Sequence, residues 1–348
     1  MDFGIFMEET RRGSSQVTAF QEGFELVDAA EAWGIDGVWL GELHFNPARS
    51  VLSAPIVVAG SIACRTKRLR VGTAVQVLPL KHPLRIAEET ATVDQLSEGR
   101  FDFGIGRSTS ARAYEVFGVP YAESQACFLE SLQVILKAWQ GEPFSYQGEF
   151  YRFENAVVSP RPYQLPHPPI RMAATTEETF PLVGRMGLSI FVGLRDMDIA
   201  ELRTHVRAYR QAWHDAGHSG DANVYLRIPV YAGTTEKGAV EEPSESITYY
   251  LNRHADLIRA AAGRAGTGPA ERRQAGAERI ANLSYTQILD TKVAFGTAAA
   301  LIDRLTQLRE ELGLDGLVAE LNPGGLIPAA LEKRSLHILS HQVMPAFK

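Results

Sequence analysis

Residues 33–40 of the sequence read Trp33-Gly34-Ile35-Asp36-Gly37-Val38-Trp39-Leu40. The first glycine follows a helical pattern, and glycine suits the position just beyond the end of a helix. The short apolar run after it predicts a buried strand. The same order of helix, glycine and apolar strand returns at Met186 to Val192 and at Leu312 to Val318. Repetition of this unit alternates helices with strands, which favours a mainly parallel sheet.

Other segments supply the remaining strands and helices of such a sheet. Two helical segments carry one apolar face each, formed by Leu202, Val206, Tyr209 and Trp213 and by Leu301, Leu305, Leu308 and Leu312. Further strand candidates are Phe3 to Phe6, Leu69 to Thr73, Phe101 to Gly104, Ile170 to Ala173, Val224 to Tyr231 and Leu317 to Glu320. The total of about eight strands predicts a closed (β/α)8 barrel of the TIM type rather than an open sheet. We expect residues 1–348 to form this single domain.

Two segments exceed the simple repeat. Residues 144–151, Phe144-Ser145-Tyr146-Gln147-Gly148-Glu149-Phe150-Tyr151, predict a β-hairpin after the fourth barrel helix. The stretch from about 235 to 291 is longer than one strand–helix unit, so an insertion near the seventh strand is expected. We interpret this insertion as a lid over the site.

Composition narrows the class of protein. Apolar residues make up 45% and charged residues 22% of the chain, as in ordinary globular enzymes. The net charge of -6 offers no basic surface for nucleic acid, so a small-molecule substrate is expected. Cys64 and Cys127 form no metal-binding or disulfide pattern, and no metal is expected. Neither a signal peptide nor a membrane-spanning apolar run is found, which favours a cytoplasmic protein without membrane association.

In a barrel of this type the site lies in the loops that follow the strands. After the second strand, Glu42 and His44 place a carboxylate and an imidazole in one short loop. Such a pair can move protons near neutral pH. The alternative is a surface histidine beside a helix-capping glutamate, and the residues alone leave both open.

The loops after the fourth and fifth strands have features of an anion site. Gly104-Ile105-Gly106-Arg107 offers exposed backbone and a guanidinium, and Ala174 to Thr179 offers hydroxyl groups at a predicted helix start. An ordinary capping box is the alternative for the second loop. The third glycine of a dinucleotide-binding G-x-G-x-x-G is missing, and no HExxH, Walker A or GxSxG motif occurs. These loops thus suit an anionic group, whereas NAD binding is poorly supported.

Taken in order, these loops resemble the bacterial luciferase-like flavin monooxygenase family over nearly the whole chain. The matching stretches are Asp2 to Phe6, Gly37 to Phe45, Val71 to Ala74, His82-Pro83 through Glu88, Asp94 to Ser97, Gly99 to Phe101, Gly104 to Arg107, Asn322 to Gly325 and Val343 to Phe347. The resemblance implies a barrel that binds reduced FMN at the carboxyl ends of its strands. Dimerisation through the N-terminal helices is implied as well.

Site residues transfer from the family only where the motifs match. Ala74-Val75 is then a non-proline cis peptide under the flavin ring, and Gly106 lies beside the reactive C4a region. The resemblance assigns Arg107, Thr176 and Thr179 to the FMN phosphate and the Ala174 backbone to the ring. Glu42 and His44 are the residues expected to act in catalysis.

Two positions depart from the family pattern. Leu43 stands where the family has the first histidine of Glu-His-His, which argues against aldehyde-oxidising, light-emitting chemistry. Gln125 replaces a second phosphate-binding arginine and predicts altered flavin binding.

The implied reaction uses reduced FMN from a separate NAD(P)H-dependent flavin reductase and O2 as co-substrate, through a C4a-hydroperoxyflavin. It oxidises a small organic substrate, and we expect this substrate to belong to secondary metabolism. A deazaflavin (F420)-dependent oxidoreductase and a non-catalytic partner similar to a luciferase β subunit are the alternatives.

Overall fold

Eight parallel strands close into a barrel in the computed structural model, which describes residues 1–8, 13–261 and 270–348. Each strand pairs with the next in parallel, and β12 returns to β1. In their order around the barrel the strands are β1 (Asp2–Met7), β2 (Gly37–Leu40), β3 (Arg70–Thr73), β5 (Phe101–Gly106), β8 (Ile170–Ala173), β9 (Ser189–Gly193), β10 (Val224–Ala232) and β12 (Gly316–Glu320). The predicted TIM-type barrel is confirmed.

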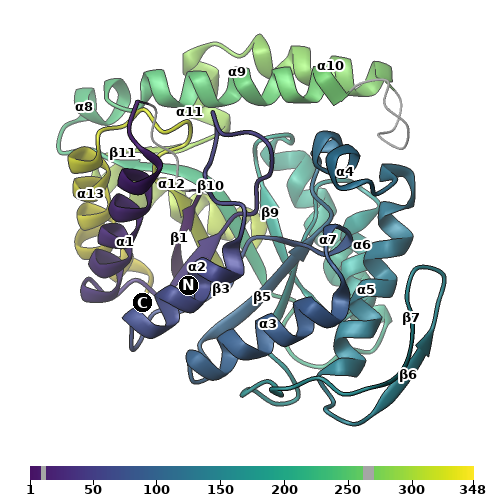
Figure 1. The fold of residues 1–348 in the computed structure, drawn as a ribbon. Helices are drawn as coiled ribbons and strands as arrows, with labels where there is room; N and C mark the ends of the chain where they lie inside the picture. Colours follow the sequence, from purple (N-terminus) through teal and green to yellow (C-terminus); the bar gives the residue numbers. More distant parts are fainter. Residues whose placement is uncertain (9–12, 262–269) are drawn as a thin grey trace.

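Helices surround this barrel (Figure 1). They are α1 (Gln16–Ala32), α2 (Pro55–Arg65), α3 (Pro83–Leu96), α4 (Ala111–Phe117), α5 (Ser124–Ala138), α6 (Thr179–Arg185), α7 (Ile199–Asp215), α12 (Ala298–Leu312) and α13 (Ala329–Ile338). The predicted apolar faces of α7 and α12 are buried in the main core. Gly34, Gly187 and Gly313 all have positive φ after their helices, as the repeated pattern predicts.

The insertion follows β10, the seventh strand of the barrel. It contains α8 (Glu236–Glu241), α9 (Ser244–Ala261), α10 (Ala270–Ala281) and α11 (Tyr285–Thr291), after which β11 (Ala294–Gly296) pairs with β10. Helices α9 and α10 lie across one end of the barrel (Figure 1). They pack with α11 through a small core of their own, centred on Ile247, Leu251 and Ile280.

A hairpin and several short elements complete the fold. Strands β6 (Phe144–Gln147) and β7 (Arg152–Ala156) pair antiparallel beside α5, so the predicted hairpin is confirmed (Figure 1). Strand β4 (Gln76–Val77) continues the path of β3 and pairs with β5. The remaining short turns are η1 (Leu78–Leu80), η2 (Tyr121–Glu123), η3 (Leu339–Val343) and η4 (Met344–Phe347).

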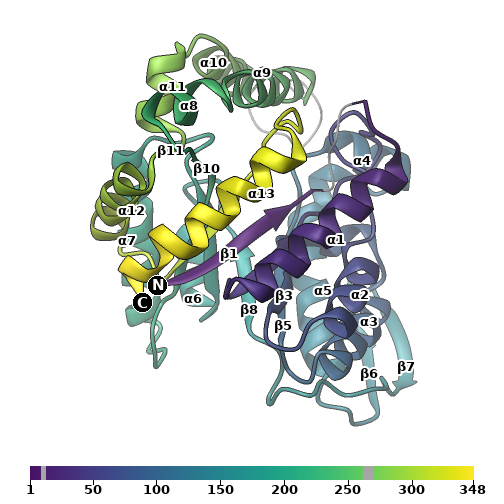
Figure 2. The same ribbon diagram turned by 90° about the vertical axis from the view of Figure 1, so that its left-hand side faces the viewer.

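Both ends of the chain lie together at the opposite end of the barrel from α9 and α10 (Figure 2). The Met1 amino group donates to the Phe347 carbonyl at 3.1 Å, which ties the last turn to the first strand. Helices α1 and α13 run side by side on the outside (Figure 2). Within the described ranges, no helix combines the length and the apolar character needed to span a membrane.

Candidate active site

A cavity of about 880 Å³ opens where the barrel strands end, beneath α9. Its walls come from the loops after the strands and from side chains of α9, among them Ile247, Tyr250 and Leu251. The carboxyl ends of the strands are where barrels of this type carry their chemistry. The volume lies near the upper end of the range for small-molecule sites, which leaves room for a cofactor together with a substrate.

The cavity brings the sequence-predicted residues together. All nine line it: Glu42, His44, Ala74, Val75, Gly106, Arg107, Ala174, Thr176 and Thr179. They follow β2, β3, β5 and β8, which are consecutive in the barrel, so they occupy one half of its mouth. We call this the β2–β8 half. The other half of the mouth is formed by β9, β10, β12 and β1, and we call it the β9–β1 half.

Glu42 fixes the orientation of His44. The Nε2 atom of His44 lies 2.7 Å from Oε1 of Glu42. The other oxygen of Glu42 accepts from the Val77 amide at 2.9 Å and from the Gln76 side chain at 2.5 Å. Since the Glu42 side chain is only 5% exposed and bonded at both oxygens, it holds the imidazole in one position. Of the two alternatives left open by the sequence, the structure favours the paired carboxylate and imidazole.

Aromatic contacts complete the surroundings of His44. Phe117, at the end of α4, meets the His44 ring edge to face at 5.0 Å between centroids. Phe45 adopts a positive φ of 53° directly after His44. Such conformations are uncommon for bulky residues and concentrate at functional loops.

An apolar wall follows β3. The Ala74-Val75 peptide is cis, as the family resemblance implies. Gly106 packs against the Val75 side chain, because a Cβ at residue 106 would lie 2.5 Å from Cγ2 of Val75. Ala74 and Val75 also join an aromatic cluster in the barrel mouth that includes Trp39 and Phe191. The wall is therefore closely packed from behind.

Hydrogen-bond donors lie just after the next two strands of the barrel, β5 and β8. Arg107 donates from Nη1 to the buried Ser124 hydroxyl at 3.1 Å, and its carbonyl accepts from Tyr114. The hydroxyls of Thr176 and Thr179 lie 2.8 Å apart at the start of α6. A guanidinium and two hydroxyls on one wall are groups that bind a phosphate. The donor set and the apolar wall thus fit FMN.

The two departures from the family pattern also face the cavity. Leu43 lines it between Glu42 and His44, and its backbone amide bonds the Leu52 carbonyl at 3.0 Å. Gln125 lines it one residue after Ser124, at the start of α5. Leu43 brings no titratable group, so in this loop only Glu42 and His44 can exchange protons.

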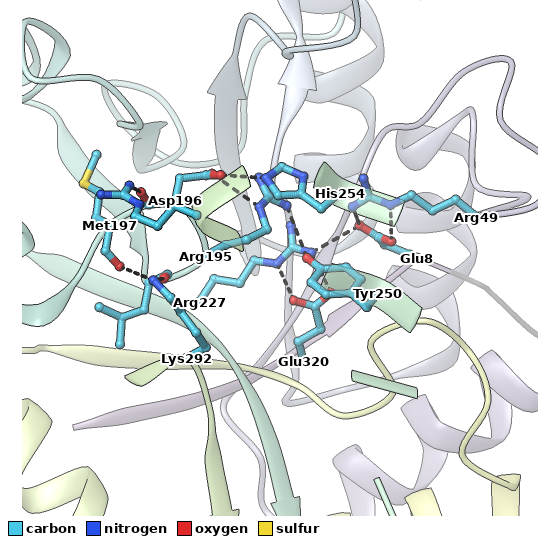
Figure 3. A network of polar contacts seen from close by, with 12 residues as sticks. Glu8, Arg49, Arg195, Asp196, Met197, Arg227, Tyr250, His254, Lys292 and Glu320 are labelled. Atoms are coloured by element: carbon cyan, nitrogen blue, oxygen red, sulfur yellow. Dashed lines mark hydrogen bonds and ion pairs between the residues drawn. The ribbon is translucent and has the colours of Figure 1, made fainter. Parts of the chain in front are cut away.

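The β9–β1 half contains a partly buried network of charges that the sequence analysis missed (Figure 3). Arg227 of β10 bonds Glu320 at the end of β12, at 2.8 and 3.2 Å, and reaches Glu8 after β1 at 3.2 Å. Arg49 bonds both oxygens of Glu8, at 3.0 and 2.5 Å. Burial would raise the pKa of Glu8, but the charges of Arg49 and Arg227 outweigh it and lower that pKa to about 2.

A second part of the network joins the loop after β9 to the insertion (Figure 3). Asp196 lies 2.6 Å from Nε2 of His254, and Arg195 donates to the Tyr250 hydroxyl at 3.2 Å. Lys292 donates to the carbonyls of Leu194 and Met197 at 2.9 and 2.8 Å. Burial and the nearby Arg195 charge lower the pKa of His254 to about 4, although its hydrogen bond to the Asp196 carboxylate acts in the opposite direction. His254 is therefore neutral at pH 7.

One sequence signal pointed to part of this network. Arg227 interrupts an otherwise apolar strand, Tyr225-Leu226-Arg227-Ile228, and Glu320 ends another. A charge inside a buried strand needs a buried partner. The partners on α9 could not be found in this way, because no local pattern relates the insertion to the barrel. Among the described residues, no cluster of His, Cys, Asp and Glu is arranged to hold a metal ion.

Comparison with known sequences gives consistent matches. The profile of the luciferase-like monooxygenase family matches residues 1–316. The oxygenase component of flavin-dependent trigonelline monooxygenase from Acinetobacter baylyi is 26% identical over 364 residues, covering 100% of this chain and 96% of that protein. The uncharacterized protein y4vJ of Sinorhizobium fredii is 32% identical over 194 residues, 55% of each chain. An alkanal monooxygenase alpha chain from the Kryptophanaron alfredi symbiont is 34% identical over 167 residues, covering 48% of this chain and 46% of the relative. The last two alignments thus span about half the length of the relatives.

Solved structures share the fold. The oxygenating constituent of 3,6-diketocamphane monooxygenase from Pseudomonas putida, in complex with FMN, has a TM-score of 0.83 and 21% identity, covering 99% of this chain and 98% of its own. The coenzyme F420-dependent tetrahydromethanopterin reductase of Methanopyrus kandleri has a TM-score of 0.75 and 18% identity, and the match covers 100% of this chain and 99% of the reductase chain. At these identities the likeness concerns the barrel itself.

Proposed function

Because this chain belongs to the luciferase-like monooxygenase family, we propose that it binds reduced FMN and uses dioxygen to oxidise a small organic substrate. The supporting observation is that a guanidinium with two hydroxyls, an apolar wall and an imidazole held by a carboxylate line one cavity. These are the three elements that a flavin oxygenase needs for cofactor binding, ring placement and proton transfer.

Each element of the β2–β8 half has a definite task in this proposal. Arg107, Thr176 and Thr179 hold the phosphate. Ala174 and the Ala74-Val75 wall support the ring, and Gly106, packed against Val75, lies at its edge. Bound reduced FMN supplies electrons for the activation of dioxygen and the transfer of an oxygen atom to the substrate. The protein contributes orientation, exclusion of water and control of protons.

His44 is the residue that exchanges protons near the bound flavin. Since its Nε2 is bonded to Glu42, Nδ1 is the atom left for exchange with the substrate or the cofactor. An imidazole is suited to this role because its ordinary pKa lies near neutrality. Glu42 acts through His44 and is a positioning residue.

The insertion acts as a lid in this proposal. Residues Tyr250 and His254 of α9 contact the loop after β9, so the helix covers the cavity from above. Exclusion of water by such a cover prolongs the life of reactive oxygenated species.

A separate flavin reductase is the proposed partner. The supporting observation is that a relative matched over the full chain is named as an oxygenase component. In addition, this sequence lacks a nicotinamide-binding motif. We also propose a homodimer through the N-terminal helices, where the apolar Val17 of α1 and Val57 of α2 are 66% and 70% exposed.

The test separates the proposal from its two rivals without knowledge of the substrate. Photoreduced FMN is titrated anaerobically into the protein, and the complex is then mixed with oxygenated buffer in a stopped-flow instrument. We expect saturable binding of reduced FMN and spectral kinetics of reoxidation that differ from those of the free flavin. Preferential binding of reduced F420 would instead support the deazaflavin enzyme. Absence of binding, with reoxidation identical to that of free FMN, would support the non-catalytic partner.

A further inference from the structure

Arg195 differs from the other cations of the β9–β1 half in the way its charge is balanced. Arg49 and Arg227 each bond both oxygens of a carboxylate. The carboxylate contact of Arg195 is with the adjacent Asp196, at 3.4 Å through Nε alone. Asp196 makes its shorter bond, 2.6 Å, to His254. Among the three arginines of this network, Arg195 therefore has the weakest hydrogen bond to a carboxylate.

The guanidinium of Arg195 is nevertheless held in place and faces the cavity (Figure 3). The Tyr250 hydroxyl accepts from Nη1 at 3.2 Å, and the Asp196 contact restrains Nε. Nη2 makes no hydrogen bond within the described part of the chain, and the side chain remains 26% exposed. One edge of a fixed, permanently charged group is thus available to a ligand.

Apolar side chains line the same half of the cavity beside the charge network. Ile247 and Leu251 of α9 line the same cavity from above, and Phe6 and Phe191 line it from the barrel. The Cζ atom of Arg227 lies 3.3 Å from the centroid of the Phe6 ring, so the Arg227 guanidinium is directed toward the barrel wall. A ligand that fills this half therefore meets apolar surface beside the edge of Arg195, while Glu8 and Glu320 are already bonded to Arg49 and Arg227.

We propose that the β9–β1 half binds a substrate that carries a carboxylate on an apolar body, and that Arg195 binds this carboxylate. The planar edge of a guanidinium matches a carboxylate in a two-point contact, and such charge-assisted bonds are strong in a site shielded from water. The inference rests on the proposed function, since the flavin occupies the β2–β8 half and its substrate the remaining space.

Two other roles for Arg195 give different expectations. A purely structural role, in which Arg195 only joins the loop after β9 to α9 through Tyr250, gives no preference for charged ligands. A role in binding the cofactor phosphate makes FMN affinity, but not carboxylate affinity, depend on Arg195.

The experiment compares ligands that differ in charge and little in shape. Benzoate and benzamide, and octanoate and octanamide, are titrated calorimetrically into the FMN-bound wild-type protein. We expect at least one acid to bind tenfold or more tightly than its amide. Equal affinities within both pairs would overturn the proposal, and this result needs no variant.

Variants then assign the preference to Arg195. Arg195→Gln should remove the tenfold preference, and Arg195→Lys should keep only part of it because the planar edge is lost. Arg259→Gln is the matched control, since Arg259 is an exposed arginine of α9 that pairs with Asp256 at 2.8 Å. A preference that survives Arg195→Gln at full size would overturn the assignment.

FMN affinity, measured in the same samples, separates this inference from the proposed function. If wild-type protein binds FMN but shows no acid preference, only the carboxylate proposal fails. If wild-type protein does not bind reduced FMN, the proposed function fails. A loss of FMN affinity in Arg195→Gln, without loss of acid preference, would place the cofactor phosphate at Arg195 instead.

Discussion

The two halves of the barrel mouth are built in different ways. In the β2–β8 half the site comes from short loops whose small or uncharged residues act partly through backbone, as at Ala74-Val75 and Gly106. In the β9–β1 half, charges from distant parts of the chain meet: Glu8 and Arg227 are 219 residues apart. Local motifs thus specify the proposed cofactor side, whereas long-range pairs specify the proposed substrate side. The first side can be shared by a family while the second changes with the substrate.

Substitution of His44 should have the largest effect of all, and this effect should be on turnover and not on cofactor binding. We expect His44→Gln to lower turnover by about 10² to 10⁴ and to keep FMN affinity within a few-fold, because general acid–base assistance is lost while the anion site remains. The rate is measured against pH with saturating reduced FMN, once a substrate is found among the acids tested above. His214→Gln, on the exposed face of α7, is the control.

A pH profile with the same inflection and the same turnover in His44→Gln would contradict the assignment. His44 would then only pack the loop against Phe117.

Arg107 tests whether the phosphate lies in the β2–β8 half. Arg107→Ala should weaken FMN binding by roughly tenfold to a hundredfold, since a charge-assisted contact contributes about 1.5 to 3 kcal/mol. Riboflavin, which has no phosphate, should lose little affinity. Both flavins are titrated by fluorescence quenching in wild type and variant. Equal losses for the two flavins would remove the phosphate from Arg107 and weaken the division between the halves.

The sequence predicted the barrel well because its signals are local. The glycine after each helix and the apolar strand that follows, as at Gly34 and Val38, are read within one unit. In the β2–β8 half, the positions after the strands pointed to Glu42, His44 and Arg107, whereas the roles of Ala74-Val75 and Gly106 came from the family resemblance. Arg195 and His254 could not be predicted, because Arg195 bonds Tyr250 and His254 bonds Asp196 only where the insertion lies over the barrel. Whether Glu42 positions His44 was also decided only by the hydrogen bonds of its two oxygens.

His254 should make stability depend on pH through the β9–β1 half. Its pKa is lowered from 6.5 to about 4 in the folded protein, so the unfolded chain takes up a proton first as the pH falls. The contribution to stability is present above pH 6.5 and is lost as the pH falls toward 4. Between pH 7 and pH 5 the loss should be about 2 kcal/mol.

Urea unfolding of wild type and His254→Gln at both pH values measures this contribution. Between pH 7 and pH 5 the free energy of unfolding of the variant should fall by about 2 kcal/mol less than that of wild type. FMN affinity at pH 7 should be unchanged. An equal pH dependence in the two proteins would show that His254 is not buried as a neutral group beside Arg195 and Asp196.

The smallest effect is expected where Gly106 meets Val75, and it tests how closely the wall of the β2–β8 half is packed. A Cβ added at Gly106 would lie 2.5 Å from Cγ2 of Val75, closer than real contacts allow, so Gly106→Ala should destabilise the protein. Val75→Ala removes that methyl group, and the double variant should therefore recover part of the loss. A coupling of about 1 kcal/mol is expected from a double-mutant cycle of urea unfolding. Gly60→Ala in α2 is the control, because a Cβ there would meet no atom closer than Cγ2 of Val93 at 3.9 Å and alanine favours the helix. Additive losses at residues 75 and 106 would mean that the surrounding residues shift to accept the added Cβ without any change at Val75. The flat surface proposed for the flavin ring would then not depend on this contact.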